Sequence, residues 1–450
     1  VTILAGQLSA TFTVKIIGDT VFEFPNESFT VDLTAPTSCT IADAQSVCTI
    51  IDNDATSSGY LASFGNWMPI TFDGYGGATT LTNWPALVRL SASIPAFDYV
   101  SFASETGGDL RFVNSDGTQL RNFEIERWDS DGESVVWVQL PELPPGGTTI
   151  WAYWNNPSDT TLPIYATNGV TWADGYRSVW HLNELNAHDS SLRGHEGSVE
   201  GESALTSGMI GQGVEFDGNG DYIQVPASID YRFNQDDFTM SAWVYPHEVG
   251  AARGIFGNWD QRFMFAIEGG TLRFHANNQV FWGSSINVSP NTWYYATVTR
   301  QGADWVYYVN GVQGDTRNNA DWSIDNHGKP LNIGAGGENY RGWFDGIIDE
   351  SRIEAERRSP DWILASYSNQ VQGSSFSTPG SILGKPLITI VDGATNITLN
   401  SAYATAQVTS TGGVSTVVRL YWGTTDGGNV PGSWDNAQLV GQVDSVPENI

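Results

Sequence analysis

The chain has 450 residues, which is enough for about three or four domains of ordinary size. Lys and Arg number 20 against 50 Asp and Glu, and the formal net charge of −30 argues against nucleic acid and anionic lipid surfaces as partners. A hydrophobic content of 40%, with 18 Trp, 17 Tyr and 20 Phe, is too high for a disordered acidic chain. Short Val-, Ile- and Thr-rich runs among 49 Gly and 19 Pro predict an all-β fold of serial sandwich modules with few helices. No apolar run is long enough to predict membrane insertion within this sequence.

The two ends and the two cysteines bear on where the protein works. The sequence opens in a strand-like stretch and stops just after another, so we expect both ends to be cuts through a longer protein. Cys39 and Cys48 flank a turn-like segment, which predicts a hairpin disulfide, with a pair of reduced, buried thiols as the alternative. The acidic, lysine-poor surface favours an extracellular or cell-surface location, where a disulfide would persist.

Residues 1–56 combine strand-like runs with clustered carboxylates. A loop carries Asp19, Glu23 and Glu27, and a later strand ends in Asp52 and Asp54. Five oxygen donors of this kind can converge on calcium, while a solvated acidic loop is the alternative. The acidic loop, the E-x-F-x-V-x-L strand and the closing T-I-x-D-x-D resemble the C-terminal half of a Calx-beta domain. That resemblance implies that the same five residues occupy calcium-ligand positions.

Residues 60–165 contain a second set of alternating strands, which predicts another sandwich. The pattern L-R-F, D-G, E-I-E-x-W-D, V-W-V-x-L and Y-W-N-N-P resembles a bacterial domain of unknown function that commonly precedes laminin-G-like modules. This family has no established chemistry to transfer.

Glu124, Glu126 and Trp128 share one face of a predicted strand, and carboxylates beside tryptophan suggest a glycosidase. Residues i and i+2 of a strand are about 6.6 Å apart and stand in a row, whereas a retaining enzyme needs two carboxyl groups about 5 to 5.5 Å apart across a cleft. Trp128 also takes the third place of the E-x-D-x-E glucanase signature. We therefore expect no catalysis at this strand.

Residues 170–372 form the longest predicted module. In residues 238–245 the apolar set Phe238, Met240, Ala242 and Val244 alternates with Trp243 and Tyr245, so both faces of this strand should be covered. Asn310-Gly311 predicts a hairpin turn, and residues 358–367 are the best candidate for a short helix.

Six motifs in order carry a family resemblance for this module: G-x-G-V-x-F-D-G, D-Y-I, F-T-M-S-A-W-V, W-Y-Y-A-T-V, Y-V-N-G and F-D-G-I-I-D-E-S-R-I. They resemble the laminin-G-like jelly roll of the concanavalin A-like lectin/glucanase superfamily. The resemblance implies a structural calcium near the D-S-S loop, with Asp189 and Asp349 as ligands.

Aromatic residues in polar, loop-like contexts are the candidates for stacking on a sugar ring; they are Trp259, Trp282, Tyr340 and Trp343. The six histidines show no H-x-x-x-H pair, so we expect them on strand surfaces or in loops and expect no zinc site.

The Gly- and Ser-rich stretch 373–385 is predicted as a linker, and residues 386–450 resemble a truncated fibronectin type III-like domain. Together these features predict a non-enzymatic adhesion or carbohydrate-binding region of a large bacterial secreted or surface protein, with calcium-stiffened modules. Its partner would be a glycan, an extracellular polysaccharide or another surface protein. Two alternatives stay open: the accessory region of a polysaccharide-degrading enzyme, and a structural stalk without a ligand.

Overall fold

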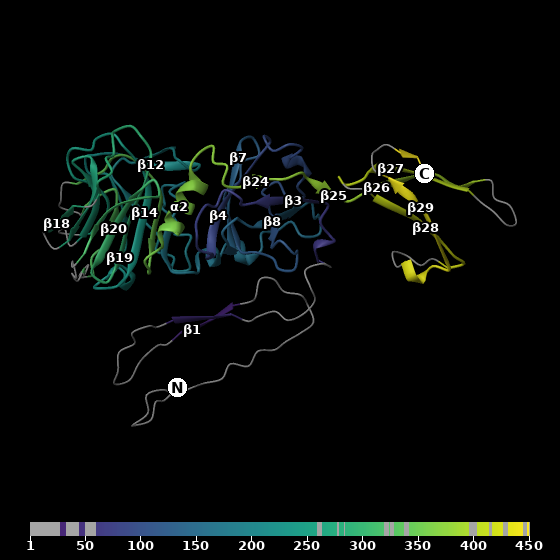
Figure 1. Ribbon diagram of the computed structural model, residues 1–450, viewed down its shortest axis with the longest axis horizontal. Helices are drawn as coiled ribbons and strands as arrows, with labels where there is room; N and C mark the ends of the chain where they lie inside the picture. Colours follow the sequence, from purple (N-terminus) through teal and green to yellow (C-terminus); the bar gives the residue numbers. More distant parts are fainter. Residues whose placement is uncertain are drawn as a thin grey trace, which may run out of the picture.

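A computed structural model describes most of the chain. The described residues are 28–32, 45–49, 60–258, 263–276, 279–282, 284–318, 324, 328–336, 342–395, 403–413, 416–425, 431–443 and 448–449. They form an antiparallel, almost entirely β structure, whose main helix is α2 (Pro360–Gln370) (Figure 1). The all-β prediction is confirmed, and so is the short helix near residue 360. Within the described part of the chain, no helix has the length and apolar character needed to cross a membrane.

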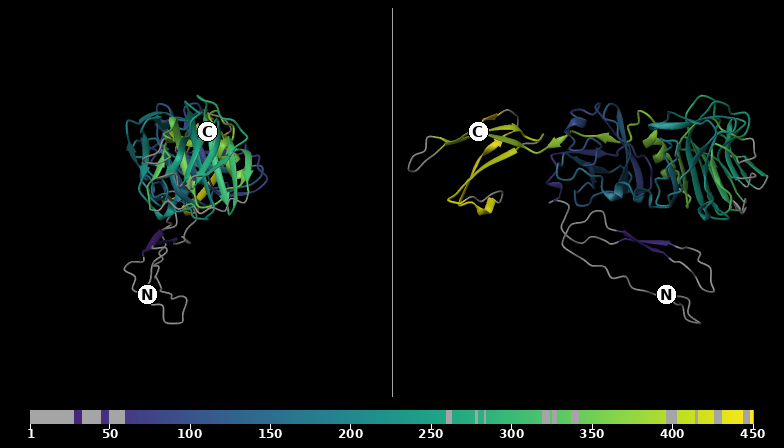
Figure 2. Two further views of the ribbon diagram at one scale, coloured as in Figure 1. Left: turned by 90° about the vertical axis from the view of Figure 1, so that its left-hand side faces the viewer. Right: turned by 180° about the vertical axis from the view of Figure 1, so that it is seen from behind.

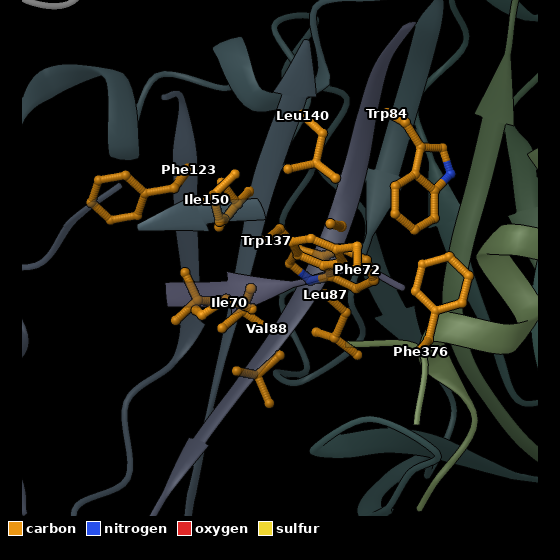
Figure 3. Close-up of a cluster of buried hydrophobic side chains, with 14 of the residues drawn as sticks. Ile70, Phe72, Trp84, Leu87, Val88, Phe123, Trp137, Leu140, Ile150 and Phe376 are labelled. Carbon is orange, nitrogen blue, oxygen red and sulfur yellow. The ribbon is translucent and has the colours of Figure 1, made fainter. Parts of the chain in front are cut away.

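The first large unit, which we call the sandwich module, packs two antiparallel sheets face to face. Its strands are β3 (Asn66–Thr71), β4 (Leu81–Ser91), β5 (Arg111–Val113), β6 (Phe123–Arg127), β7 (Glu133–Leu143) and β8 (Thr149–Trp154). One sheet contains β3, β8 and β5, and the other has the order β4-β7-β6. Alternate residues of both sheets fill the core shown in Figure 3, where Trp137 and Phe72 lie near its centre.

The second unit is a two-sheet jelly roll. Its strands are β9 (Tyr176–Trp180), β10 (Ser198–Glu200), β11 (Ala204–Ser207), β12 (Gln212–Asp217), β13 (Tyr222–Val225), β14 (Phe238–Pro246), β15 (Arg253–Asn258), β16 (Phe263–Glu268), β17 (Thr271–Ala276), β18 (Gln279–Trp282), β19 (Tyr294–Gln301), β20 (Asp304–Val309), β21 (Val312–Arg317), β22 (Leu331–Ile333) and β23 (Asp345–Glu354). A seven-stranded sheet has the order β10-β13-β22-β15-β16-β17-β18. An eight-stranded sheet has the order β11-β12-β23-β14-β19-β20-β21, and β9 also pairs with β23.

Strand β14 shows why the two units are joined. Its residues Phe238, Met240, Ala242 and Val244 point into the jelly-roll core, as the alternation predicts. Trp243 points the other way and packs against Tyr295 and against Tyr367 of α2. Its indole N–H donates to Gln370 Oε1 at 2.8 Å. The outer side of the eight-stranded sheet is therefore buried beneath α2 around Trp243 and Tyr295.

Helix α2 lies between the jelly roll and the sandwich module (Figure 1). Ser359 caps its N-terminus by accepting from Trp362 N–H. At the other end, the Asn369 side chain bonds both backbone groups of Leu87 in β4. One continuous cluster of buried apolar side chains runs from the sandwich module through α2 to the outer side of the jelly roll. The two units thus share a core.

The stretch 373–385, predicted as a linker, returns to the sandwich module. Two short strands, β24 (Thr378–Pro379) and β25 (Leu383–Gly384), both pair with β3. Phe376, between α2 and β24, packs against Trp84 with ring centroids 5.5 Å apart (Figure 3). The chain therefore visits the sandwich module, the jelly roll and the sandwich module again before continuing (Figure 2).

The remaining described strands form smaller sheets. Near the start of the chain, β1 (Ser28–Asp32) pairs with β2 (Gln45–Thr49). Near its end, β26 (Leu387–Thr395), β27 (Tyr403–Ser410) and β30 (Glu448–Asn449) form one sheet, and β28 (Thr416–Trp422) pairs with β29 (Asn436–Val443).

Candidate functional site

The outer face of the seven-stranded sheet is the first candidate surface. Phe265, Phe274 and Ile333 lie in the jelly-roll core, so the residues that alternate with them point away from it. We call this the outer face; its members are Met264, Ala266, Arg273, His275 and Asn332.

Polar groups on the outer face are close together and incompletely paired. Glu268 Oε2 lies 3.1 Å from Arg273 Nη1 and 3.1 Å from His275 Nε2. Burial lowers the pKa of His275 below its ordinary value, although the Glu268 charge opposes this effect. Asn332 Oδ1 is buried without a hydrogen-bond partner. His275 and Asn332 are buried, and Arg273 is partly exposed.

A loop lies close over part of this sheet at two glycines of β15. A Cβ on Gly254 would lie 2.7 Å from the Ala335 carbonyl carbon, and one on Gly257 would lie 2.6 Å from the Ala335 oxygen. Gly254 N–H donates to Gly342 O at 2.7 Å. The segments around 335 and 342 therefore border the outer face and carry the chain to Trp343.

The predicted sugar-stacking residues map to this sheet as far as they are described. Trp343 is half-buried, its carbonyl accepts from Arg253 Nη1 at 3.0 Å, and its indole nitrogen has no partner. Trp282 is the last residue of β18 and stands opposite Arg273 in register. Trp259 and Tyr340 lie outside the described residues.

The N-terminal predictions are largely beyond what the structure describes. Asp19, Glu23, Glu27, Asp52 and Asp54 lie outside the described residues, so the Calx-beta-like calcium site stays a prediction. The same holds for the disulfide. Cys39 lies outside the described residues, and Cys48 is placed only by its backbone, opposite Phe29 in the β1–β2 pair.

Asp189 and Asp349, predicted as calcium ligands of the jelly roll, have different surroundings. The Asp189 carboxylate accepts three backbone N–H groups, from Val179 at 2.8 Å, Ser191 at 3.0 Å and His195 at 2.7 Å. These bonds organise the D-S-S loop, and calcium binding by Asp189 stays a prediction. Asp349 accepts from Ile210 N–H at 2.9 Å through one oxygen, and its Oδ1 is buried without a partner.

A second candidate site lies where the sandwich module meets the jelly roll. We call it the junction cluster; its members are Glu124, Glu126, His181, Asp349, Glu350 and Arg352. His181 Nδ1 lies 2.7 Å from Glu350 Oε1 and 3.4 Å from Glu126 Oε2, and its Nε2 lies 3.7 Å from Glu124 Oε2. Carboxylates from both units therefore surround one imidazole.

Irregular backbone brings these side chains together. Strand β6 has one extra residue relative to β7 between Ile125 and Arg127, which places Glu126 in a bulge. The register between β14 and β23 shifts at Glu350, whose φ is 52°. Leu182, next to His181, has a φ of 59°. Residues other than glycine seldom adopt this left-handed region, and such strain concentrates at functional sites.

Charge interactions in the cluster change the pKa values of its members. Burial, reinforced by the charge of Glu350, raises the pKa of Glu126 to about 8. Burial likewise raises the pKa of Asp349 well above its usual range. Burial alone would raise the pKa of Glu350, but the charges of His181 and Arg352 outweigh it and lower that pKa. Burial opposes protonation of His181, yet Glu350 and Glu126 hold its pKa well above the usual value.

Hydrogen bonds and a pocket complete the site. Trp137 Nε1 donates to Glu126 Oε2 at 2.8 Å, and Ser190 Oγ donates to Glu124 Oε1 at 2.6 Å. A pocket of about 290 Å³ reaches Glu124, Glu126 and His181 from the surface. The carboxylates of Glu124 and Glu126 therefore contact indole, hydroxyl and imidazole groups.

Sequence reasoning missed the burial of His181. It lies in the loop after β9, as expected for a histidine outside the strands, but it is only 4% exposed and lies at the centre of the cluster. Trp128 packs edge-on against Tyr99 and Phe102. Glu350 and Arg352 stood within the quoted D-E-S-R motif, but nothing in the sequence signals the bulge that turns Glu350 inward.

Comparison with known proteins agrees with the two units. Residues 217–364 match the family described as the concanavalin A-like lectin/glucanases superfamily. Residues 106–169 match a domain of unknown function, DUF2341. No curated protein matches the chain.

Solved structures share part of the fold at low identity. Domain 4 of AbnA, an extracellular arabinanase from Geobacillus stearothermophilus solved with arabinotriose, is 17% identical over 44% of this chain and 100% of that domain, with a TM-score of 0.38. The binding domain of Paraclostridial Mosquitocidal Protein 1 is 17% identical over 43% of this chain and 52% of its own, with a TM-score of 0.37. The botulinum neurotoxin type G receptor-binding domain is 14% identical over 44% and 52%, with a TM-score of 0.35. At these values the likeness says nothing about what this chain binds. The chain contains a concanavalin A-like jelly roll, preceded by a DUF2341 segment.

Proposed function

We propose that this chain is a non-enzymatic, extracellular recognition region whose jelly roll binds carbohydrate on the outer face of its seven-stranded sheet. The observation that carries the proposal is which sheet does not pack against α2. The middle of the eight-stranded sheet is packed against α2 through Trp243 and Tyr295. On the seven-stranded sheet Met264, Ala266 and Asn332 are buried, and Arg273 is partly exposed, so a ligand would reach this face at Arg273. The family match of residues 217–364, to a superfamily named for lectins and glucanases, supports carbohydrate as the ligand class.

The chemistry of the outer face supports binding rather than hydrolysis. Glycoside hydrolysis normally requires two carboxyl groups flanking the bond. Glu268, the carboxylate beside Arg273 and His275 on the outer face, is engaged by both of them. Arg273 offers donors that can bind sugar hydroxyls, and Trp282 and Trp343 are the proposed stacking residues.

The shared core supports a role for the sandwich module as well. Because the two units are joined through α2 and β24, the jelly roll would be presented at a fixed angle on its neighbour. Such rigidity suits an adhesion protein, in which the recognition module must stand in a defined position. Calcium bound by the N-terminal carboxylates would stiffen the next joint in the same way.

A glycan array probed with the full chain tests this proposal. We expect binding to a defined group of glycans, with loss of signal for Trp282→Ala. Trp422→Ala is the matched control, because Trp422 is 45% exposed on β28, outside the jelly roll. Absence of binding to any glycan, or equal binding by both variants, would contradict carbohydrate recognition on this face.

A further inference from the structure

The junction cluster contains more negative than positive groups in a buried place. In the described part of the chain, His181 and Arg352 are the cationic groups that act most strongly on the four carboxylates Glu124, Glu126, Asp349 and Glu350. Taking carboxylates out of water costs several kcal/mol each unless they are paired, protonated or bound to a metal. The cluster therefore needs further positive charge or protons.

Polar atoms in the cluster also lack partners. Oε1 of Glu126, Nε2 of His181 and Oδ1 of Asp349 are buried, and none of them has a hydrogen bond. The Glu126 side chain is fully buried, and that of His181 is 5% exposed. Buried polar atoms are nearly always satisfied, so we take the unpartnered atoms on three members of the cluster as a sign of an absent ligand.

The geometry of three residues suits a metal ion. Ligand atoms of Glu126, His181 and Glu350 all lie within 4.8 Å of one another. Glu126 Oε2 lies 3.4 Å from His181 Nδ1, close to the roughly 3.3 Å that separates ligands of a tetrahedral zinc ion. Glu350 Oε1 lies 2.7 Å from the same nitrogen, which is a hydrogen-bond distance, so a bound ion would replace this bond.

Neighbouring side chains hold these ligands in place. Trp137 donates to Glu126, and Arg352 donates to Glu350 while its guanidinium stacks 4.4 Å from the Trp137 ring. Outer partners of this kind orient metal ligands. The left-handed Glu350 is a further sign, since backbone strain is retained where a site requires it.

We propose that the junction cluster binds one divalent transition-metal ion of the zinc class through Glu126, His181 and Glu350. Glu126 belongs to β6 of the sandwich module, whereas Glu350 belongs to β23 of the jelly roll. The ion therefore ties the two units together, and the 290 Å³ pocket is its route of entry. An imidazole ligand favours zinc-class ions over calcium, which prefers oxygen ligands alone. This site is separate from the calcium positions expected in residues 1–56.

Metal titration of the full chain tests the proposal. After treatment with a chelator, isothermal titration calorimetry should show one Zn²⁺ bound per chain, and an equal concentration of Ca²⁺ should not displace it. Co²⁺ should bind at the same stoichiometry and give the visible absorption of a nitrogen- and oxygen-ligated ion.

Two variants locate the site. Glu126→Gln keeps the side-chain size and should weaken Zn²⁺ binding by about ten-fold or more. Glu142→Gln is the matched control, because Glu142 is exposed on β7 of the same unit. If Glu126→Gln fails to fold, the Co²⁺ spectrum of the unaltered chain tests the proposal, which predicts the visible absorption of a nitrogen- and oxygen-ligated ion. No stoichiometric uptake of Zn²⁺ or Co²⁺ by the unaltered chain, or equal uptake by both folded variants, would overturn the proposal.

Discussion

Replacing Asn369 tests whether α2 joins the two units. Strand β4 is an edge strand of its sheet, and Asn369 covers that edge at Leu87. Leu87 N–H donates to Asn369 Oδ1 at 2.6 Å, and Asn369 Nδ2 donates to Leu87 O at 3.1 Å. Asn369→Ala leaves two buried backbone groups unpaired, at about 1–3 kcal/mol each, so we expect a loss of about 2–6 kcal/mol in the free energy of unfolding.

Guanidinium denaturation of the full chain, followed by tryptophan fluorescence and near-UV circular dichroism, measures this loss. The shared core predicts that sandwich module and jelly roll unfold in one transition in the unaltered chain. Asn436→Ala is the control, because Asn436 is exposed on β29, and its effect should stay within about 0.5 kcal/mol. A loss below about 1 kcal/mol for Asn369→Ala would refute the reasoning, because the two bonds would then contribute nothing specific to the joint.

Three further predictions concern other parts of the two units. Gly257→Ala should lower stability by about 1–3 kcal/mol, because its Cβ would meet backbone atoms of residues 335 and 336. Gly441→Ala, with open space around it, should not do so in the same thermal melt. Asp361 accepts from the Thr79 hydroxyl at 2.7 Å and from the backbone of residues 78 and 79, and these bonds lower its pKa. The stabilisation by Asp361 should be present above about pH 4 and lost as the pH falls further. The difference in melting temperature between the unaltered chain and Asp361→Asn should therefore shrink in acid. A difference that stays constant with pH would exclude this role. Burial, which outweighs the opposing charge of Glu268, lowers the pKa of His275, so this side chain binds a proton more readily in the unfolded chain. Stability should therefore fall as pH drops below about 6.5, and His275→Gln should reduce that fall, whereas an unchanged pH profile would contradict it.

Local patterns in the sequence were enough for the fold. The alternation in residues 238–245 correctly predicted that Met240 points into the core and that Trp243 is buried on the other side, because side-chain direction in a strand follows from spacing alone. The helix predicted near residue 360 begins after a Ser359 cap with a proline in its first turn, which are local signals for a helix start. The pairing of β24 with β3 could not be predicted, since it joins segments about 300 residues apart through backbone hydrogen bonds.

The candidate sites were less predictable. Glu124 and Glu126 attracted attention as a pair, but their partner His181 lies far along the chain, and only the shared core brings the three together. The bulge at Glu350 depends on how β14 and β23 are paired, which short-range spacing does not encode. Asp189 was predicted as a calcium ligand from the family resemblance, and its hydrogen bonds to the backbone of Val179 in β9 and of His195 could not be predicted from the sequence.

Hydrogen–deuterium exchange of the full chain, with and without a glycan that it binds, tests the central claim most directly. Carbohydrate recognition on the outer face predicts new protection in β16, β17 and β18, with no change in β6 or in residues 181–190. Protection confined to the junction pocket, or no protection in the seven-stranded sheet under saturating glycan, would contradict the claim.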